Sequence, residues 1–260
     1  MNIELLESIP IVFIFAGIAI LMLAFGEVGY RIGERRQTCQ DTEAPTSLGP
    51  MVGGVLGMLA FILAVTFSMA ASQHDLRKQN VLEEANSIGT AYLRSDLIDK
   101  QYGTEVKRLL REYVNVRLNA ASGSDINTAM KKSVKIHNLL WTQVSSAARE
   151  NPGTNSSLVI QSINDVIDMH EKRVTGALRN RIPVSVWLAL FAIIALTMIT
   201  IGTQVGLSCK RRLVAMIPLI LAFAVLVTLV VDLNRPQSGL ITVGQQSMAN
   251  LKSSMGGDTK

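Results

Sequence analysis

Four long apolar runs interrupt an otherwise polar sequence, and they form two pairs, one toward each end of the chain. None of the runs contains Lys, Arg, Asp or Glu. A helix that rises about 1.5 Å per residue needs about 20 residues to cross the hydrocarbon of a bilayer. The runs have about this length and predict four transmembrane helices, over Ile9–Phe25, Pro50–Ser72, Val184–Gly202 and Leu213–Val231.

The stretch between the two pairs, Gln73–Pro183, is polar and helical in pattern. From Asp75 to Leu97, apolar positions recur at steps of about 3.6 residues with charged side chains between them. Helix-tolerant residues join this stretch to the second apolar run, so we expect one long helix that continues out of the bilayer. Three further amphipathic helices are expected, from Thr104 to Ala120, from a Ser124 or Asp125 cap to the Asn151-Pro152-Gly153 turn, and from Ser156 to Pro183.

These patterns predict an all-α integral membrane protein, with four transmembrane helices in two hairpins and an intervening helical bundle. The first run follows Glu4 and Glu7 rather than basic residues, so it lacks the positive region of a signal peptide and should remain as a helix. We expect disorder from Met255 to Lys260. The predicted domains are 1–72, the first hairpin; 73–183, the water-exposed bundle; 184–233, the second hairpin; and 234–260, a polar C-terminal tail.

The formal charge of +5 is common for membrane proteins, whose basic residues lie at lipid headgroups. The lipid bilayer is therefore the partner that the composition implies, and no nucleic acid is needed to explain the charge. Basic residues do not decide the orientation, because the short loops and the opposite side carry similar numbers of them. Cys39 and Cys209 fall in the two short loops, where they either pair or remain unrelated thiols.

Residue patterns typical of enzymes are missing from the sequence, which has no Walker loop, no GxSxG and no HExxH. The histidines His74, His137 and His170 lie in separate predicted helices, without a second ligand at metal-binding spacing. His170 falls on an apolar stripe and is expected to be buried or at an interface. We therefore expect no enzymatic activity, no metal site and no cofactor.

The second apolar run carries two patterns that suit a pore. Large apolar side chains project from one helix face at i, i+4 and i+8, which gives a candidate pore neck of Leu59, Leu63 and Phe67. Lipid or core contact is the ordinary role of such residues, but around a symmetry axis they would form apolar rings that gate by dewetting. The polar residues that follow suit a wet pore vestibule: Ser68, Ser72, His74 and Asp75.

Glycines spaced by four residues favour the close approach of helices in lipid. They indicate packing within one subunit or, on the second membrane helix, an interface between subunits. Such spacings occur at Gly29 and Gly33, at Gly202 and Gly206, and in the series Gly49, Gly53 and Gly57.

The second membrane helix and its extension read GMLAFILAVTFSMAASQHDLRKQNVLEEANSIGTAYLR over Gly57–Arg94. This segment resembles the bacterial bestrophin-like family of unknown function, whose members carry a similar FSMAAS, EEAN and GTAYLR series. The segment DLNRPQSGLI, Asp232–Ile241, resembles that family's Asp-x-Asp-Arg-Pro-x-x-Gly pattern, and it departs from the pattern at Asn234, which removes one carboxylate. The resemblance covers nearly the whole chain and includes a membrane-interface motif at Asp232, Asn234, Arg235 and Pro236.

The resemblance implies what is known of bestrophins, which are pentameric anion channels with a pore lined by the second membrane helix. By this analogy the chain is a homo-oligomeric ion channel, a pentamer that conducts small inorganic ions and slightly favours anions. It would lie in the inner (plasma) membrane, with the middle bundle and both termini in the cytoplasm. The acidic calcium clasp of animal bestrophins has no counterpart here, so calcium gating is not implied.

Two alternatives come from other classes. A membrane-anchored helical sensor or scaffold could bind a ligand or partner through the middle bundle, although the chain carries no kinase, cyclase or signalling coiled coil. An enzyme that acts on lipid is a third possibility. At the residue level, Asp232 and Arg235 either stop a helix with an ion pair or take part in permeation, and Glu83 and Glu84 either pair with basic residues of neighbouring helices or face the ions.

Overall fold

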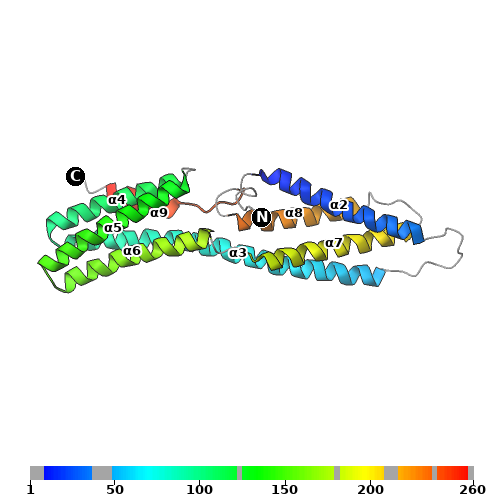
Figure 1. Cartoon of the computed structure of the whole chain (residues 1–260), viewed down its shortest axis with the longest axis horizontal. Helices are drawn as coiled ribbons and strands as arrows, with labels where there is room; N and C mark the ends of the chain where they lie inside the picture. Colours follow the sequence, from blue (N-terminus) through cyan, green and yellow to red (C-terminus); the bar gives the residue numbers. More distant parts are fainter. Residues whose placement is uncertain are drawn as a thin grey trace. The chain divides into compact units, whose positions relative to one another are not determined.

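The structure is a computed structural model that describes residues 9–36, 49–121, 125–178, 182–207, 216–235 and 239–256. Every regular element within these ranges is helical, which confirms the predicted all-α fold. In chain order (Figure 1) the elements are α2 (Ile11–Arg36), α3 (Gly49–Arg94), the short 3-10 helix η1 (Ser95–Leu97), α4 (Lys100–Ala121), α5 (Ile126–Glu150), α6 (Thr154–Leu178), α7 (Val184–Leu207), α8 (Ile217–Asn234) and α9 (Gln246–Gly256).

Four of these helices, α2, α3, α7 and α8, are long and apolar enough to cross a membrane, as predicted. α2 continues beyond the predicted end at Phe25 to Arg36, and within this extension Arg31 Nε pairs with Glu27 Oε1 at 3.0 Å across one helical turn. α3 is a single helix of 46 residues, so the expected unbroken extension of the second membrane helix is present.

The chain divides into two compact units. Unit 1 holds residues 1–74 and 181–242, and unit 2 holds residues 75–180 and 243–260. The predicted domain borders lie after residues 72, 183 and 233, and the units divide after residues 74, 180 and 242. Each unit has its own hydrophobic core.

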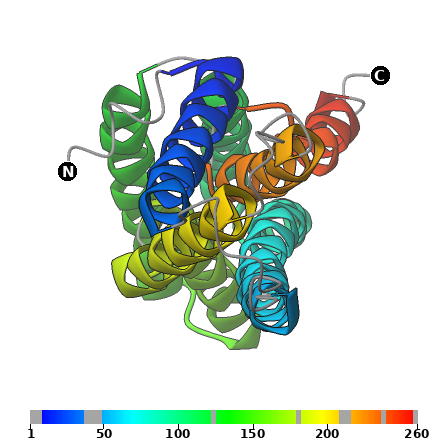
Figure 2. The same ribbon diagram turned by 90° about the vertical axis from the view of Figure 1, so that its right-hand side faces the viewer.

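The core of unit 1 is almost wholly apolar. Met22 of α2, Leu190 and Met198 of α7 and Val227 of α8 are fully buried there. α2 and α7 approach each other closely, as the ribbons show (Figures 1 and 2).

Glycines make this close approach possible. A Cβ added at Gly29 would collide with the backbone of Ile199, and one at Gly202 would collide with the carbonyl group of Gly26. Thr203 Oγ1 also donates a hydrogen bond to the Gly29 carbonyl oxygen at 3.2 Å. Two of the glycine pairs noted in the sequence therefore allow α2 and α7 of one chain to pack closely, whereas Gly53 and Gly57 have open space around them.

Unit 2 contains the second part of α3 together with α4, α5 and α6, the four amphipathic helices that the sequence predicts. Asp125 caps α5 by accepting a hydrogen bond from the Asn127 amide at 3.1 Å. α5 ends at Glu150, directly before the predicted turn at Asn151. The core is built from fully buried apolar side chains such as Ile88, Leu110, Leu140 and Ile163.

The polar tail behaves differently from the sequence expectation. Val243–Lys260 belongs to unit 2, and it contains α9, whose Met248 and Met255 are buried in the core of that unit. Arg111 Nε donates a hydrogen bond to the Met255 carbonyl oxygen at 3.1 Å, close to the end of α9. The prediction of disorder is therefore wrong at Met255 and Gly256, and residues 257–260 lie outside the described ranges.

Candidate functional site

The three residues of the predicted pore neck do not share one environment. Leu59 and Leu63 are 0% and 4% exposed and belong to the core of unit 1, whereas Phe67 is 39% exposed. Each step of four residues turns the side chain by about 40° around the helix, so a row at i, i+4 and i+8 drifts off one face. For Leu59 and Leu63 the structure favours the core alternative, and the role of Phe67 in a neck stays a prediction.

The face of α3 opposite Leu59 and Leu63 is exposed and carries mostly small side chains. We call this set the small face of α3: Gly53, Gly57, Phe61, Ala64, Ser68 and Ser72. Phe61, which is 69% exposed, is its one large member, and the other side chains are hydrogen, methyl or hydroxymethyl groups.

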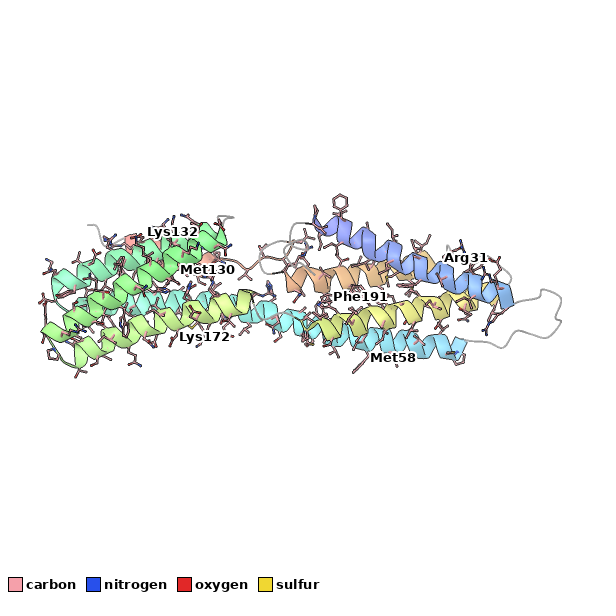
Figure 3. All side chains as sticks on the ribbon, viewed as in Figure 1. Arg31, Met58, Met130, Lys132, Lys172 and Phe191 are labelled. Atoms are coloured by element: carbon pink, nitrogen blue, oxygen red, sulfur yellow. The ribbon has the colours of Figure 1, made fainter. Side chains whose placement is uncertain are left out.

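A second exposed stripe of α3 lies beside the small face and is large and apolar. Met51, Met58, Val65 and Met69 form this stripe, and Figure 3 shows Met58 projecting outward from the helix. Of the most apolar 18-residue stretch of α3, only 17% is buried, which is a smaller share than in the corresponding stretches of α2, α7 and α8. Within one chain, α3 is thus the least covered of the four candidate membrane helices.

The predicted vestibule residues lie at the end of this segment. Ser68, Ser72 and Asp75 are exposed, and His74 is half-buried. Ser68 and Ser72 donate no hydrogen bond within the described part of the chain. The buried Thr66, by contrast, donates to the Ile62 carbonyl oxygen at 2.7 Å, which is the usual way a hydroxyl is satisfied inside an apolar helix.

The membrane-interface motif forms a backbone clasp where α8 ends. Asp232 is buried, and its carboxylate accepts hydrogen bonds from the amides of Leu240 and Ile241 at 3.0–3.1 Å. Gly239 has a φ of +140°, and a Cβ there would collide with the Asp232 carboxylate, so the turn requires glycine.

The other members of the motif also bind backbone groups. Asn234 Oδ1 accepts from the Ile182 amide at 3.3 Å, and Arg235 Nη1 donates to the Ile9 carbonyl oxygen at 2.9 Å. Pro236 lies outside the described residues. These contacts favour the alternative in which Asp232 and Arg235 stop α8 over a role in permeation, but they are contacts with backbone groups rather than between the two side chains.

Unit 2 contains a buried cluster of ionisable and polar side chains. Glu84 of α3 is fully buried and forms ion pairs with Arg117 of α4, at 3.3 Å, and with Arg173 of α6. Tyr113 donates its hydroxyl proton to Glu84 Oε1 at 2.6 Å. We call the whole set the Glu84 cluster: Glu84, Tyr113, Arg117, His137, His170 and Arg173.

Three rings of the cluster are in mutual contact. The ring centroid of His137 lies 4.8 Å from that of Tyr113 and 4.8 Å from that of His170. The Tyr113 hydroxyl lies 3.0 Å from His170 Nδ1, within hydrogen-bond distance. The histidines that the sequence placed in separate helices thus meet, except for His74, which is in unit 1.

Burial dominates the protonation chemistry of the cluster. It raises the pKa of Tyr113 well above its ordinary value, which keeps the hydroxyl protonated as a donor. Burial also lowers the pKa of His137 and of His170 to about 4, and the positive charge of Arg117 acts in the same direction. Both imidazoles are therefore neutral at neutral pH.

The cluster does not have the composition of a metal centre. Among the described residues, no group of three His, Cys, Asp or Glu side chains is placed to hold a metal ion. The two guanidinium groups beside Glu84 would also repel a cation.

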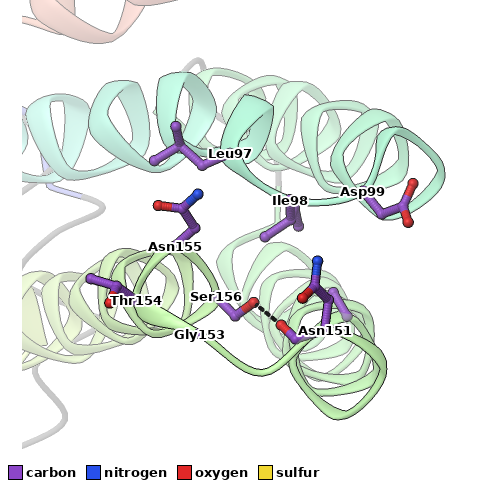
Figure 4. Close-up of a pocket in the computed structure, with 9 residues that line it drawn as sticks. Leu97, Ile98, Asp99, Asn151, Gly153, Thr154, Asn155 and Ser156 are labelled. Carbon is purple, nitrogen blue, oxygen red and sulfur yellow. Dashed lines mark hydrogen bonds between the residues drawn. The ribbon is translucent and has the colours of Figure 1, made fainter.

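One open pocket lies in unit 2, beside the turn between α5 and α6 (Figure 4). Asp99, Asn151 and Asn155 contribute polar groups to its lining, and Ser156 Oγ donates to the Asn151 carbonyl oxygen at 2.6 Å. The bond from Ser156 is a common one between a helix start and the turn before it, and the pocket indicates no particular ligand.

Comparison with known proteins gives one match. A family model described as the bestrophin-like domain matches residues 18–248, which include most of all four candidate membrane helices and all of α4, α5 and α6. No curated protein and no solved structure matches the chain.

Proposed function

The chain belongs to the bestrophin-like family, and on this basis we propose that it forms an oligomeric ion channel whose pore is lined by α3. The proposed oligomer is a homopentamer in the plasma membrane, with the unit 2 bundle in the cytoplasm and no enzymatic activity. Small inorganic ions are the proposed substrate, with anions slightly favoured by the family analogy.

The observation that carries this proposal is the small face of α3. Lipid tails favour large apolar side chains, and the neighbouring stripe with Met58 and Met69 has them, but the small face presents Ser68 and Ser72 without an acceptor in the described chain. Hydroxyl groups in this position are better satisfied by water than by hydrocarbon. A single chain offers four membrane helices, too few to enclose a pore, so a wet small face requires further copies of α3 around an axis.

The placement of Glu84 is consistent with anion passage. A ring of exposed carboxylates would favour cations. Glu84 is instead fully buried and paired with Arg117 and Arg173, so its negative charge is not presented to the solvent. Asp75 remains exposed, and its replacement by Asn should increase the preference for anions.

Cysteine accessibility tests the proposed lining directly. In a Cys39→Ser, Cys209→Ser background, single variants Ser68→Cys and Ser72→Cys are reconstituted in planar bilayers and treated with a charged thiol reagent. Blocked currents are expected for both variants, because their side chains would face water in the pore. Met58→Cys on the large apolar stripe is the matched control and should be insensitive.

Each outcome has a definite meaning. Equal insensitivity at Ser68, Ser72 and Met58 in a conducting protein would remove α3 as the lining. A complete lack of current under any ionic gradient, or a monomeric mass for the detergent-solubilised particle, would contradict the channel and leave the sensor or scaffold alternative. Parallel recordings of Phe61→Ala and Phe67→Ala test which aromatic ring constricts the pore.

A further inference from the structure

The Glu84 cluster joins every main element of unit 2. α3 contributes Glu84, α4 contributes Tyr113 and Arg117, α5 contributes His137, and α6 contributes His170 and Arg173. Arg173 also donates a hydrogen bond to Gln245 Oε1 at 2.8 Å, which connects the cluster to the segment directly before α9. A change in the charge of the cluster therefore alters contacts of four helices and of the C-terminal segment at the same time.

The hydrogen bonds fix where protons lie in the cluster. Tyr113 has a single hydroxyl proton, and the ion-paired Glu84 can only accept, so this proton lies between them. The Tyr113 oxygen must then accept from Nδ1–H of His170, which leaves Nε2 of His170 as the basic nitrogen. Proton uptake by His170 therefore occurs at Nε2.

His137 is the least satisfied member of the cluster. The residue is 5% exposed, and its Nε2 has no hydrogen-bond partner in the described part of the chain. Its ring neighbours are Tyr113, at a tilt, and His170, in an edge-on arrangement, and these ring contacts do not replace a hydrogen bond to water. Glu84 and Arg117 act on both histidines, and Arg173 acts in addition on His170. With one carboxylate and two guanidinium groups, the cluster already carries more positive than negative charge.

We propose that the Glu84 cluster is an acid-operated switch, in which proton uptake by His137 and His170 opens the bundle of unit 2 and releases α9. A new imidazolium would repel Arg117 and Arg173 and would compete with them for Glu84. Weakening of the Glu84–Arg173 pair frees Arg173 from its position beside Gln245, and α9 then loses one of its anchors. The switch goes beyond conduction and does not depend on it.

The sign and range of the pH response follow from the two histidines. Their pKa is about 4 in the closed bundle, against about 6.5 for a histidine in water. The closed state is thus fully favoured above about pH 6.5 and loses stability as the pH falls toward 4. Between pH 7.5 and 5 the open state should gain about 30-fold in relative population for each histidine.

Hydrogen–deuterium exchange of the full chain in detergent measures this opening. Exchange rates corrected for the intrinsic effect of pH are compared at pH 7.5 and 5 for peptides from α9, α6 and α7. Protection of α9 and α6 should fall by more than tenfold at pH 5, while protection of α7 in unit 1 stays unchanged. The double variant His137→Phe, His170→Gln, which retains His74, should lose this pH response.

The control is Lys135→Gln, an exposed position on the same helix as His137, which should respond to pH as the wild type does. Equal α9 protection at both pH values in the wild type would overturn the switch, as would a full response in the double variant. A parallel loss of protection in α7 would indicate general acid unfolding and would also overturn it. If the double variant does not fold, His137→Phe alone should show a response about 30-fold smaller. Because no step uses ion currents, this result is independent of the proposed channel.

Discussion

The two units of this chain stabilise their cores in different ways. In unit 1 the core is apolar, and the helices approach through glycine, as at Gly29 and Gly202. In unit 2 an apolar core surrounds an ionised carboxylate, two guanidinium groups and two neutral imidazoles. In lipid the hydrophobic effect does not drive helices together, so close van der Waals contact between them must stabilise their association. In water the burial of apolar side chains stabilises a helical bundle, and this gain can offset the cost of burying a polar network.

This difference predicts different sensitivities. Unit 1 should respond to changes in side-chain volume at the helix contacts, and unit 2 should respond to changes in charge. The two tryptophans of the chain separate these responses, since Trp141 lies on α5 in unit 2 and Trp187 on α7 in unit 1. A Trp187→Phe background reports unit 2 by fluorescence, and a Trp141→Phe background reports unit 1.

The largest effect is expected from Glu84→Gln. The amide keeps the shape of the side chain but leaves Arg117 and Arg173 without their buried counter-ion. Loss of one partner of a buried ion pair destabilises by about 3–5 kcal/mol. Denaturant unfolding at pH 7.5, followed by Trp141 fluorescence, measures the loss.

The adjacent carboxylate provides the control. Glu83 is half-buried and accepts a hydrogen bond from Gln79 Nε2 at 2.8 Å on the helix surface. Glu83→Gln should therefore change the stability of unit 2 by less than about 0.5 kcal/mol. Similar losses for both variants would show that the Glu84 cluster does not stabilise unit 2 in the way we describe.

A smaller effect is expected from Gly202→Ala in unit 1. The added methyl group would collide with the Gly26 carbonyl group and separate α2 from α7, at a cost of about 2 kcal/mol. Unfolding followed by Trp187 fluorescence measures this loss. Gly57→Ala is the control, because its Cβ would meet nothing within 4 Å, and it should be neutral or slightly stabilising. If both substitutions gave the same result, glycine contact would not be what holds α2 to α7.

The smallest effect on stability is expected from Ser68→Ala. The side chain is exposed and donates no hydrogen bond within the described residues, so unit 1 should change by less than about 0.5 kcal/mol. Leu63→Ala on the buried face of the same helix should destabilise by about 2–5 kcal/mol. Trp187 fluorescence compares the two, and a stable Leu63→Ala protein would restore Leu63 as a candidate for the pore neck.

Much of the fold could be predicted from the sequence, because its signals are local. Unbroken apolar runs predicted the four membrane helices, and the lack of a helix breaker near His74 predicted the long α3. α9 escaped prediction because its apolar content is small, and only the packed structure shows Met248 and Met255 filling the core of unit 2.

The candidate sites were harder to predict, because they depend on packing between distant residues. Glu84 and Arg173 are 89 positions apart, and no spacing rule connects them. The local signals were two. One was the hypothesis that Glu83 and Glu84 pair with basic residues of neighbouring helices, which the structure shows for Glu84, and the other was His170 on an apolar stripe. The environments of Leu59 and Leu63 could not be predicted for a geometric reason, since the sequence does not show which side of α3 meets the other helices of the same chain.

The position of α9 in the chain has a consequence for biosynthesis. The helices α3 to α6 are synthesised early, but Met248 and Met255 are added only after α7 and α8 have been synthesised. Until then the nascent bundle exposes the apolar surface that α9 later covers. The core of unit 2 can therefore close only when synthesis of the chain is nearly finished, and a polypeptide stalled before residue 246 should be bound by chaperones.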